Sequence, residues 1–548
     1  MSATAERPGV SSRARPVGAA IAALAALGVF TFSFLRPTNF RGYDEWLIFW
    51  MLSRRLISFP YANRPFGLVW HVPAWMLAPD RLWGFQLVHA FWLTVVGVLA
   101  FLIVRRLLPG HPDLAFLGGA LAIAWMPSEE TRIATVQMIQ YSGCTAGALL
   151  ATWLLLEAGH RRSRVLLLAA ATVATITALS FEATLPVLGM GAGLLLLGST
   201  RAEARRRLPW AAGWLVLTAA LGLRAILPVV THLESLGYQL GGSSSLRPAR
   251  GVLRHTGIQL RYHLHPLTDF RVAELAEPAV WLAVVLFVAG LVVATRGQRE
   301  EPRGAPARGA IALAGLLGLG HAVLAYLPFL LTRGVRGPVR TEFLSAAGIG
   351  VLIAAVVVLV ASLAPPRARL VVVATLGAWV VAGGTGRTIA MQREWDASLY
   401  ANQRSTLQQI GAMAPGLQPH TLVILMQSGH TWFYSFTFSK AVEYLYADAA
   451  RGWAPGADPF LLEARLEPDA VWWEPDIATR RPWRQDVERY RHEEVVVFGE
   501  DDAGRVRMLD TWPADLGPLP PGARYAPRSR IRAEGPAPTQ LAIVSAPR

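Results

Sequence analysis

The chain has 548 residues, of which 53% are hydrophobic and only 16% are charged, whereas soluble domains carry about 25% charged residues. It also contains several apolar stretches long enough to cross a bilayer, which excludes a soluble globular protein. The net charge of +15 is unevenly divided, because residues 388–548 sum to −3 and the first 387 residues therefore carry +18.

The excess positive charge lies in short loops between apolar segments. Basic loops of this kind mark the cytoplasmic face of a membrane protein, so the charge does not indicate nucleic-acid binding. Cys144 is the single cysteine, which excludes an intrachain disulfide and a cysteine-based metal cluster.

Eleven apolar segments predict a polytopic helical membrane domain over residues 1–387. They lie at roughly 17–35, 83–104, 114–127, 142–158, 165–181, 183–198, 209–227, 279–295, 309–331, 341–362 and 369–386. Residues 66–79 are also apolar, but the segment is short and contains His71 and Pro73. We predict an interfacial or re-entrant element there, because a further span would invert every later loop.

The arginines define the orientation of the predicted domain. With a cytoplasmic N-terminus, every inner loop is basic, and the long outer loops are 36–82 and 228–278. The six arginines of residues 36–82 depart from the positive-inside pattern, which long loops escape, and they are candidates for chemistry. An odd number of spans then places residues 388–548 outside the cell.

Residues 388–548 have the pattern of a small extracytoplasmic α/β domain. Thr421–Met426 and Glu494–Phe498 are predicted to be buried strands, and Thr437–Ala449 is predicted to be a helix. The Pro-rich tail from about Leu519 is predicted to be loosely ordered. The predicted fold class is therefore an all-α polytopic membrane protein with a small C-terminal α/β domain.

Ionisable residues gather at the predicted outer ends of the helices, whereas the middle of the membrane contains mainly His321. Because ionisable groups at membrane depth are costly, they indicate a functional site, here an extracytoplasmic cavity. The residues are Asp44, Glu45, Glu129, Glu130, Glu182, Arg224, Arg340 and Glu342.

Each of these residues has a structural interpretation beside the functional one. Asp44 and Glu45 can act as a general base or hold a divalent metal, or they can cap the helix that follows. Glu129 and Glu130 follow Ser128, which is typical of a helix N-cap. We expect Glu182, in a tight hairpin, to be buried with a partner.

The arginines also have two interpretations. Arg224 and Arg340 can bind phosphate through the guanidinium fork, or they can extend to the lipid headgroups. The nucleotide-binding patterns GxxxxGK[ST] and GxGxxG are missing from the sequence, which argues against a nucleotide-driven pump.

Short motifs follow one another in a characteristic order along residues 17–390. They are Tyr43-Asp44-Glu45, Asn63-Arg64-Pro65, Gln86-Leu87-Val88-His89, Met126-Pro127-Ser128-Glu129-Glu130, Ser180-Phe181-Glu182 with Pro186, Leu327-Pro328, and Arg340-Thr341-Glu342-Phe343-Leu344. This order resembles the GT-C polytopic glycosyltransferases, particularly the bacterial relatives of protein O-mannosyltransferases. The chain departs from that pattern at Phe181, where lysine is common, and in lacking a His-Pro-Pro element.

The resemblance implies an enzyme of the bacterial cytoplasmic membrane that takes a sugar from a polyprenyl-phosphate donor. A hydroxyl group on a glycan, lipid or protein would accept the sugar at the extracytoplasmic face, with inversion at the anomeric carbon. Asp44, beside Glu45, would be the base, and Arg340 with Arg224 and Arg64 would bind the donor phosphate. Glu129, Glu130 and Glu182 would orient the acceptor or a divalent metal (Mg or Mn), whose involvement stays open.

Two other classes of protein remain as alternatives. A transporter or flippase for lipid-linked saccharide would place ionisable residues near the midplane, as His321 is placed. A ligase that transfers a whole lipid-linked glycan would share the outer arginines.

Overall fold

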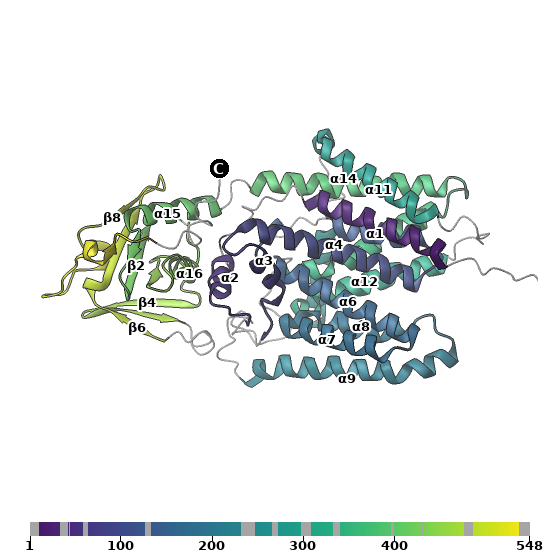
Figure 1. Cartoon of the computed structure of the whole chain (residues 1–548), viewed down its shortest axis with the longest axis horizontal. Coiled ribbons are helices and arrows are strands. Elements are labelled where there is room, and N and C mark those ends of the chain that lie inside the picture. Colours follow the sequence, from purple (N-terminus) through teal and green to yellow (C-terminus); the bar gives the residue numbers. More distant parts are fainter. Residues whose placement is uncertain are drawn as a thin grey trace, which may run out of the picture.

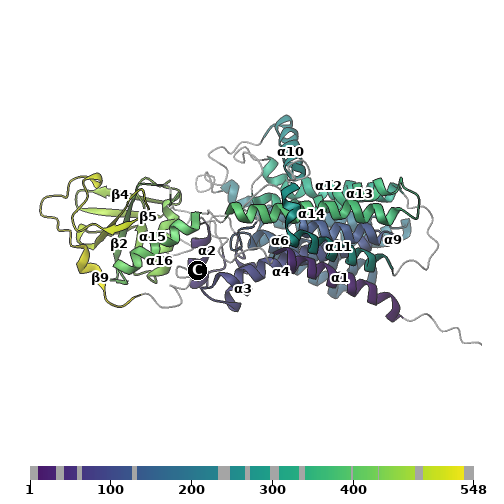
Figure 2. The same ribbon diagram turned by 90° about the horizontal axis from the view of Figure 1, so that it is seen from above.

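The computed structural model describes residues 10–32, 42, 44–58, 64–125, 133–231, 247–265, 272–296, 308–331, 340–395, 399–429, 431–475 and 486–535. A bundle of long helices makes up one part of the protein, and an α/β domain lies against one end of it (Figures 1 and 2). Helix α1 begins at the opposite end of the bundle (Figure 1). We call the end that carries the α/β domain the domain end.

Eleven helices in the described part of the bundle correspond to the eleven predicted apolar segments, which confirms the predicted fold class. Seven of them contain a stretch long and apolar enough to cross a membrane, and the apolar parts of α1, α5, α7 and α8 are shorter. The helices are α1 (Val10–Phe32), α4 (Leu82–Leu107), α5 (Pro112–Ala124), α6 (Ile139–Arg161), α7 (Arg164–Ser180), α8 (Leu185–Leu196), α9 (Arg201–Thr231), α11 (Pro278–Arg296), α12 (Arg308–Leu331), α13 (Ala346–Ala361) and α14 (Arg369–Trp395).

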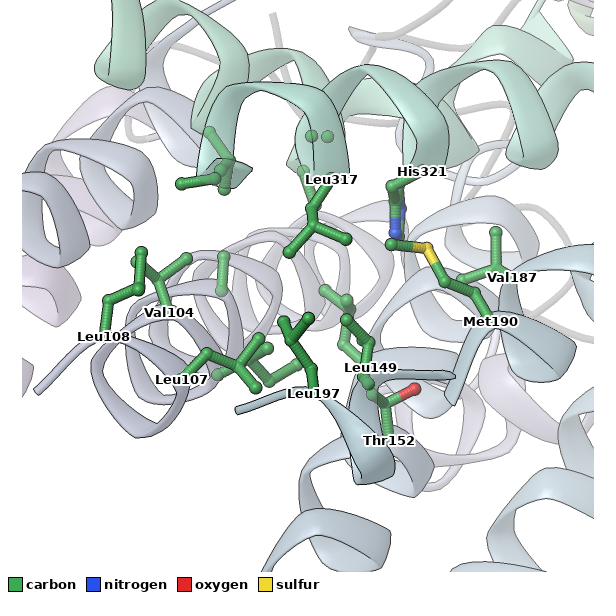
Figure 3. Close-up of a pocket in the computed structure, with 18 of the residues that line it drawn as sticks. Val104, Leu107, Leu108, Leu149, Thr152, Val187, Met190, Leu197, Leu317 and His321 are labelled. Atoms are coloured by element: carbon green, nitrogen blue, oxygen red, sulfur yellow. The ribbon is translucent and has the colours of Figure 1, made fainter. Parts of the chain in front are cut away.

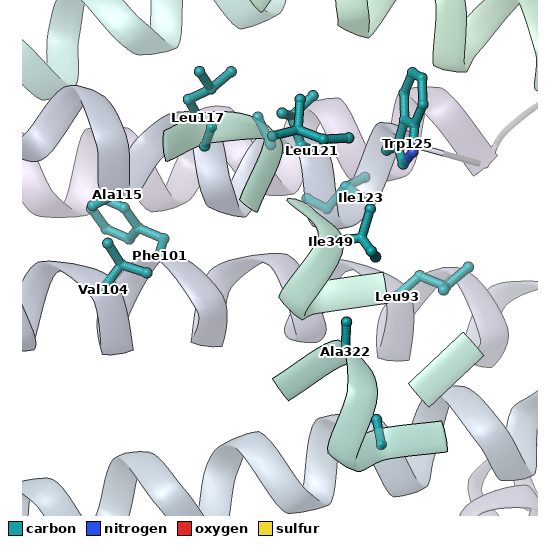
Figure 4. Close-up of a cluster of buried hydrophobic side chains, with 14 of the residues drawn as sticks. Leu93, Phe101, Val104, Ala115, Leu117, Leu121, Ile123, Trp125, Ala322 and Ile349 are labelled. Atoms are coloured by element: carbon teal, nitrogen blue, oxygen red, sulfur yellow. The ribbon is translucent and has the colours of Figure 1, made fainter. Parts of the chain in front are cut away.

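Small residues let the helices of the bundle approach one another closely. A Cβ atom on Gly318 of α12 would come within 2.7 Å of the Gly348 carbonyl oxygen of α13, and one on Gly97 would meet Gly119 at the same distance. The hydrophobic effect does not favour helix association in lipid, so close van der Waals packing at such crossings holds the helices together instead. Figure 4 shows part of the core around them, with Leu121, Ile349 and Ala322 on adjoining helices.

The outside of the bundle has the composition of a lipid-facing surface. Large apolar side chains are exposed on α9, α11, α12 and α14, among them Val216, Trp281, Leu316 and Val371. In water such a surface would be a liability, so the protein is a multi-pass membrane protein.

Short elements occupy the loops between the long helices of the bundle. They are α2 (Asp44–Ser53), η2 (Val69–His71) and α3 (Val72–Leu77) in the first loop, η4 (Glu182–Thr184), α10 (Ala249–Leu264), η7 (Val272–Ala276) and η8 (Arg340–Ser345). The ambiguous segment 66–79 therefore forms a 3-10 turn and a six-residue helix, too short to span a bilayer.

The described residues of the α/β domain form three small sheets. A mixed sheet has the order β3-β2-β7-β8, with β3, β2 and β7 parallel and β8 antiparallel. An antiparallel sheet has the order β4-β5-β6, and β1 pairs with β9. The elements are α15 (Leu399–Met413), β1 (Gly416–Leu417), β2 (Thr421–Gln427), α16 (Ser435–Leu445), β3 (Ala450–Trp453), β4 (Leu462–Glu467), β5 (Ala470–Pro475), β6 (Glu488–Tyr490), η9 (His492–Glu494), β7 (Val495–Glu500), β8 (Val506–Met508), η10 (Ala514–Leu516), η11 (Pro527–Arg530) and β9 (Ile531–Arg532).

The predicted strands and helix of this domain are confirmed as β2, β7 and α16, but two expectations were wrong. Helix α14 continues to Trp395, beyond the predicted boundary at residue 388. The proline-rich segment after Leu519 is anchored as far as the described residues reach, because Tyr525 accepts a hydrogen bond from the Val497 amide and donates one to the Leu509 carbonyl.

Candidate functional site

Asp44 is the first residue of α2 and points a carboxylate oxygen at the start of α6. The Gln137 side-chain amide donates a 2.9 Å hydrogen bond to Asp44 Oδ2. Asp44 is partly exposed, whereas the neighbouring Glu45 has no accessible surface. Of the predicted acidic pair, Asp44 is thus the carboxylate that a substrate can reach. Both acids also lie in the first turn of α2, where negative charge favours the helix.

Arg64 and Glu182 form a two-pronged ion pair at the same end of the bundle. Arg64 Nε lies 2.8 Å from Glu182 Oε2, and Nη2 lies 2.6 Å from Oε1. The guanidinium carbon sits 4.5 Å from the centre of the Phe181 ring. Glu182 therefore has the partner predicted for it, but its side chain is 35% exposed rather than buried. The ion pair engages two of the donor groups with which Arg64 would bind phosphate.

The beginning of α6 brings these two groups together. Gln137 contacts Asp44, and Gln140 donates to the Ser180 carbonyl, 3.2 Å away, next to the hairpin of Glu182. His71 of η2 is buried, and its Nε2 lies 3.0 Å from the Val136 carbonyl. Burial lowers the pKa of His71 to about 4, so the neutral ring donates this bond. Two loops far apart in the sequence, the first loop and the hairpin of Glu182, thus meet at one end of α6.

The sequence analysis missed Gln137 and Gln140. The signal was present, since two amide side chains stand three residues apart where a turn enters an apolar helix, a spacing that places side chains on one face of a helical turn. The candidate site residues were all ionisable side chains, and glutamine amides are neutral.

An apolar cavity of about 80 Å³ lies among α4, α6, α8, α12 and α13. Figure 3 shows Leu107 and Leu108 toward one end of it and His321 beside Met190 toward the other. A smaller cavity shares His321 and Val187 and reaches Thr184, two residues after Glu182. The smaller cavity therefore reaches η4, the element that begins with Glu182.

The other predicted site residues are not part of this group in the described structure. Arg224 is exposed on α9. Glu129 and Glu130 lie outside the described residues, and Arg340 begins η8 with its side chain outside the described part.

Glu342 belongs to a second buried polar group beneath α10. Glu342 Oε2 lies 3.9 Å from His263 Nε2, and both side chains are almost completely buried. Gln259 of α10 donates to the Ser345 hydroxyl at 3.0 Å, and Ser345 in turn donates to the Ala322 carbonyl of α12. These contacts fix α10 and η8 to the bundle.

Within the described ranges, no group of three or more histidine, cysteine, aspartate or glutamate side chains is arranged to hold a metal ion. Asp44 and Glu45 alone do not supply the six oxygen ligands that Mg²⁺ prefers. Water and substrate phosphate usually supply the remaining ligands of a protein-bound Mg²⁺ ion, so the involvement of a divalent metal stays a prediction.

Comparison with known proteins gives one structural likeness. No family model and no curated protein matches the chain. The chain is similar to the crystal structure of ArnT from Cupriavidus metallidurans bound to undecaprenyl phosphate, with 13% identity and a TM-score of 0.38. The similarity covers 76% of this chain and 83% of that chain. A likeness this loose assigns no role to any residue.

Proposed function

We propose that the protein is a membrane glycosyltransferase that moves a sugar from a polyprenyl-phosphate donor to a hydroxyl acceptor. One observation carries this proposal. An accessible carboxylate, Asp44, and a partly buried guanidinium group, Arg64, lie at the same end of the bundle, and apolar cavities inside the bundle extend as far as Thr184 of η4. We infer that this domain end faces the extracytoplasmic side, because the arginine-rich loops belong to the opposite end.

The arrangement supports a single displacement. Asp44 would take the proton of the acceptor hydroxyl as its oxygen attacks the anomeric carbon, and the bond from that carbon to the phosphate oxygen would break. Gln137 holds the carboxylate in one orientation, which favours both proton transfer and in-line attack. Attack from the face opposite the phosphate would invert the anomeric carbon.

The departing polyprenyl phosphate would need positive charge close by. Arg64, oriented by Glu182, supplies a fixed guanidinium group, and Arg340 and Arg224 are the further arginines that the sequence proposes. The cavity lined by Leu149, Met190 and Leu317 would hold part of the prenyl chain. A lipid-borne donor of this kind requires no nucleotide-binding motif.

The transporter alternative gains no support from His321. Its Nε2 donates a 3.3 Å hydrogen bond to the Leu344 carbonyl, so the ring joins α12 to η8.

The test compares a deletion strain complemented with the wild-type gene, with Asp44→Asn or with Asp501→Asn, a distant surface carboxylate. We expect the deletion and Asp44→Asn strains to accumulate a polyprenyl-phosphate-linked sugar and to lose one sugar from an envelope glycan. Because general-base catalysis contributes about 10²- to 10⁴-fold, residual transfer should be near background. Mass spectrometry of lipid-linked sugars and envelope glycans measures both.

The membrane leaflet in which the lipid-linked sugar accumulates distinguishes a transferase from a flippase. In a strain lacking a transferase, the sugar faces outward and membrane-impermeant periodate oxidises it in intact spheroplasts. In a strain lacking a flippase, the sugar faces the cytoplasm and is protected. Protected donor, or wild-type glycans in the Asp44→Asn strain, would contradict the proposal.

A further inference from the structure

The mixed sheet of the α/β domain has the topology of a ligand-binding sheet. Strands β3, β2 and β7 are parallel, but β3 is added on one side of β2 and β7 on the other, so the order of strand addition reverses between β2 and β7. In parallel sheets, ligands bind at the carboxyl ends of the strands at such a point. Thr431 follows the end of β2, and Glu500 ends β7. Thr406 of α15 donates to Glu500 at 3.0 Å, which places the middle of α15 at this edge.

In this protein the edge of the sheet holds the first loop at Gly42 and Trp46, through Gln403. Gln403, one turn before Thr406 on α15, is completely buried. Its amide nitrogen donates to the Gly42 carbonyl at 2.9 Å and to the Thr431 carbonyl at 3.0 Å. Its amide oxygen accepts a hydrogen bond from Trp46 Nε1 at 2.8 Å. Both amide hydrogens and the oxygen of Gln403 therefore join the first loop to the sheet edge.

The fit of Gly42 against Gln403 is close. Gly42 has φ +83°, a conformation that side chains disfavour. A Cβ atom there would lie 2.4 Å from Gln403 Oε1. The Trp46 ring, buried completely, lies 6.3 Å from the Trp432 ring of the α/β domain. Asp44 therefore lies between two residues that the domain fixes.

The far end of α2 is fastened to the same domain. Trp50 Nε1 donates to Asp448 Oδ1 at 2.8 Å, and the Lys440 ammonium lies 4.0 Å from the centre of the Trp50 ring. Arg54 forms an ion pair with Asp448 as well. With both ends held, α2 cannot rotate independently of the α/β domain.

Resting on the proposed function, we infer that Gln403 is a positioning residue for Asp44 and that the α/β domain forms part of the active site. The edge of the sheet where a ligand would bind is used instead to hold the loop that carries the base. The contacts act through the Gly42 carbonyl and the Trp46 indole, so Gln403 itself touches no substrate.

The test compares Gln403→Met with Gln409→Met. Methionine keeps the volume of glutamine and removes its hydrogen bonds. Gln409 is on the same helix and also bonds backbone groups, the Gly504 carbonyl and the Val506 amide, but far from α2. Hydrogen–deuterium exchange of the peptide covering residues 44–53 is measured on the full-length protein, which requires no knowledge of the substrate. We expect exchange to rise about tenfold in Gln403→Met and to stay at the wild-type rate in Gln409→Met.

Turnover per folded molecule is the second readout, with the lipid-linked sugar that accumulates in the deletion strain as the probe. Misplacing a catalytic group by about 1 Å can cost 10²-fold, so kcat should fall roughly 10- to 100-fold in Gln403→Met while KM for the lipid donor stays within about twofold. A purely structural role would lower the amount of folded protein and leave kcat unchanged.

The two readouts separate failure of this inference from failure of the proposed function. Equal exchange in the two variants, or faster exchange with an unchanged kcat, overturns the positioning role. If the wild-type protein transfers no sugar, the proposed function fails, and the exchange data alone decide whether Gln403 holds α2.

Discussion

The bundle and the α/β domain achieve burial in opposite ways. The bundle core consists largely of alanine, glycine and leucine, and its helices touch through backbone atoms at Gly97, Gly119, Gly318 and Gly348. The domain core is rich in aromatic and β-branched side chains and also encloses the Lys440–Glu443 ion pair. The cavity and the lipid chain we propose for it belong to the first environment, and the buried Lys440–Glu443 ion pair belongs to the second.

The two environments meet at α2. Residues Trp46–Leu52 belong to the same hydrophobic cluster as β2, β7 and α16, although α2 is separated from them in sequence by the entire bundle. Chemistry that joins a lipid-borne group to a water-soluble one requires such a boundary, with low charge on one side and fixed polar groups on the other. Three predictions probe the contrast.

The largest effect is expected for the buried ion pair. Lys440 Nζ lies 3.0 Å and 2.9 Å from the two Glu443 oxygens, and both side chains are almost fully buried. Lys440→Met should lower the free energy of unfolding of the domain by about 3–5 kcal/mol, because Glu443 stays buried without that ammonium group. Thermal unfolding followed by tryptophan fluorescence measures the loss. The double variant Lys440→Met/Glu443→Gln should recover at least half of it, and a double variant as unstable as the single one would show that the pair is not the cause.

An intermediate effect is expected at a helix crossing of the bundle. Gly318→Ala puts a Cβ atom 2.7 Å from the Gly348 oxygen and 2.8 Å from the Leu352 nitrogen, both backbone atoms that cannot turn away. We expect a loss of about 1–3 kcal/mol from overpacking, seen as a lower melting temperature in detergent. Gly320→Ala, two residues along α12 and with open space around its Cβ position, is the control. Equal melting temperatures for the two variants would mean that α12 and α13 separate easily.

The smallest effect is expected for the pair at the boundary itself. Glu182→Gln keeps the shape of the side chain but removes the charge that orients Arg64. We expect sugar transfer to fall about tenfold, because loss of a charge-assisted bond of 1–2 kcal/mol would misplace the guanidinium group. Glu157→Gln, which disturbs the pairs with Arg106 and Arg161 at the opposite end, should leave transfer unchanged. Equal loss in both variants would place the effect in general stability.

Hydrophobicity made the bundle predictable from the sequence, because a membrane span requires a long apolar run and few other structures have one. The same contrast made three site residues predictable, because charged residues next to apolar runs are easy to recognise in a sequence. These residues are Asp44, Arg64 and Glu182. The domain boundary was placed too early because Thr388 and Arg393 are polar, yet α14 carries them on to Trp395. Composition alone cannot show that a helix continues through a helical turn made of polar residues.

The parts of the site that could not be predicted depend on neutral groups and on distance along the chain. Gln403 is an ordinary residue of a polar helix, and its partner Gly42 is 361 positions away. No local pattern links the two. The long separation also explains why the arginines of the first loop seemed out of place, since Arg54 finds its partner in Asp448 of the α/β domain.

The pairing of α2 with the α/β domain has a consequence for the order of events during synthesis. The ribosome makes Trp50 398 residues before Asp448, and at roughly 5–20 residues per second the helix waits on the order of 20–80 s for its partner. During that interval the apolar sequence DEWLIFWMLS has no protein surface to cover it. The lipid interface or another protein must shelter its two tryptophans during that interval, so the loop that carries Asp44 gains its contacts with the α/β domain only after the strands of that domain have been made.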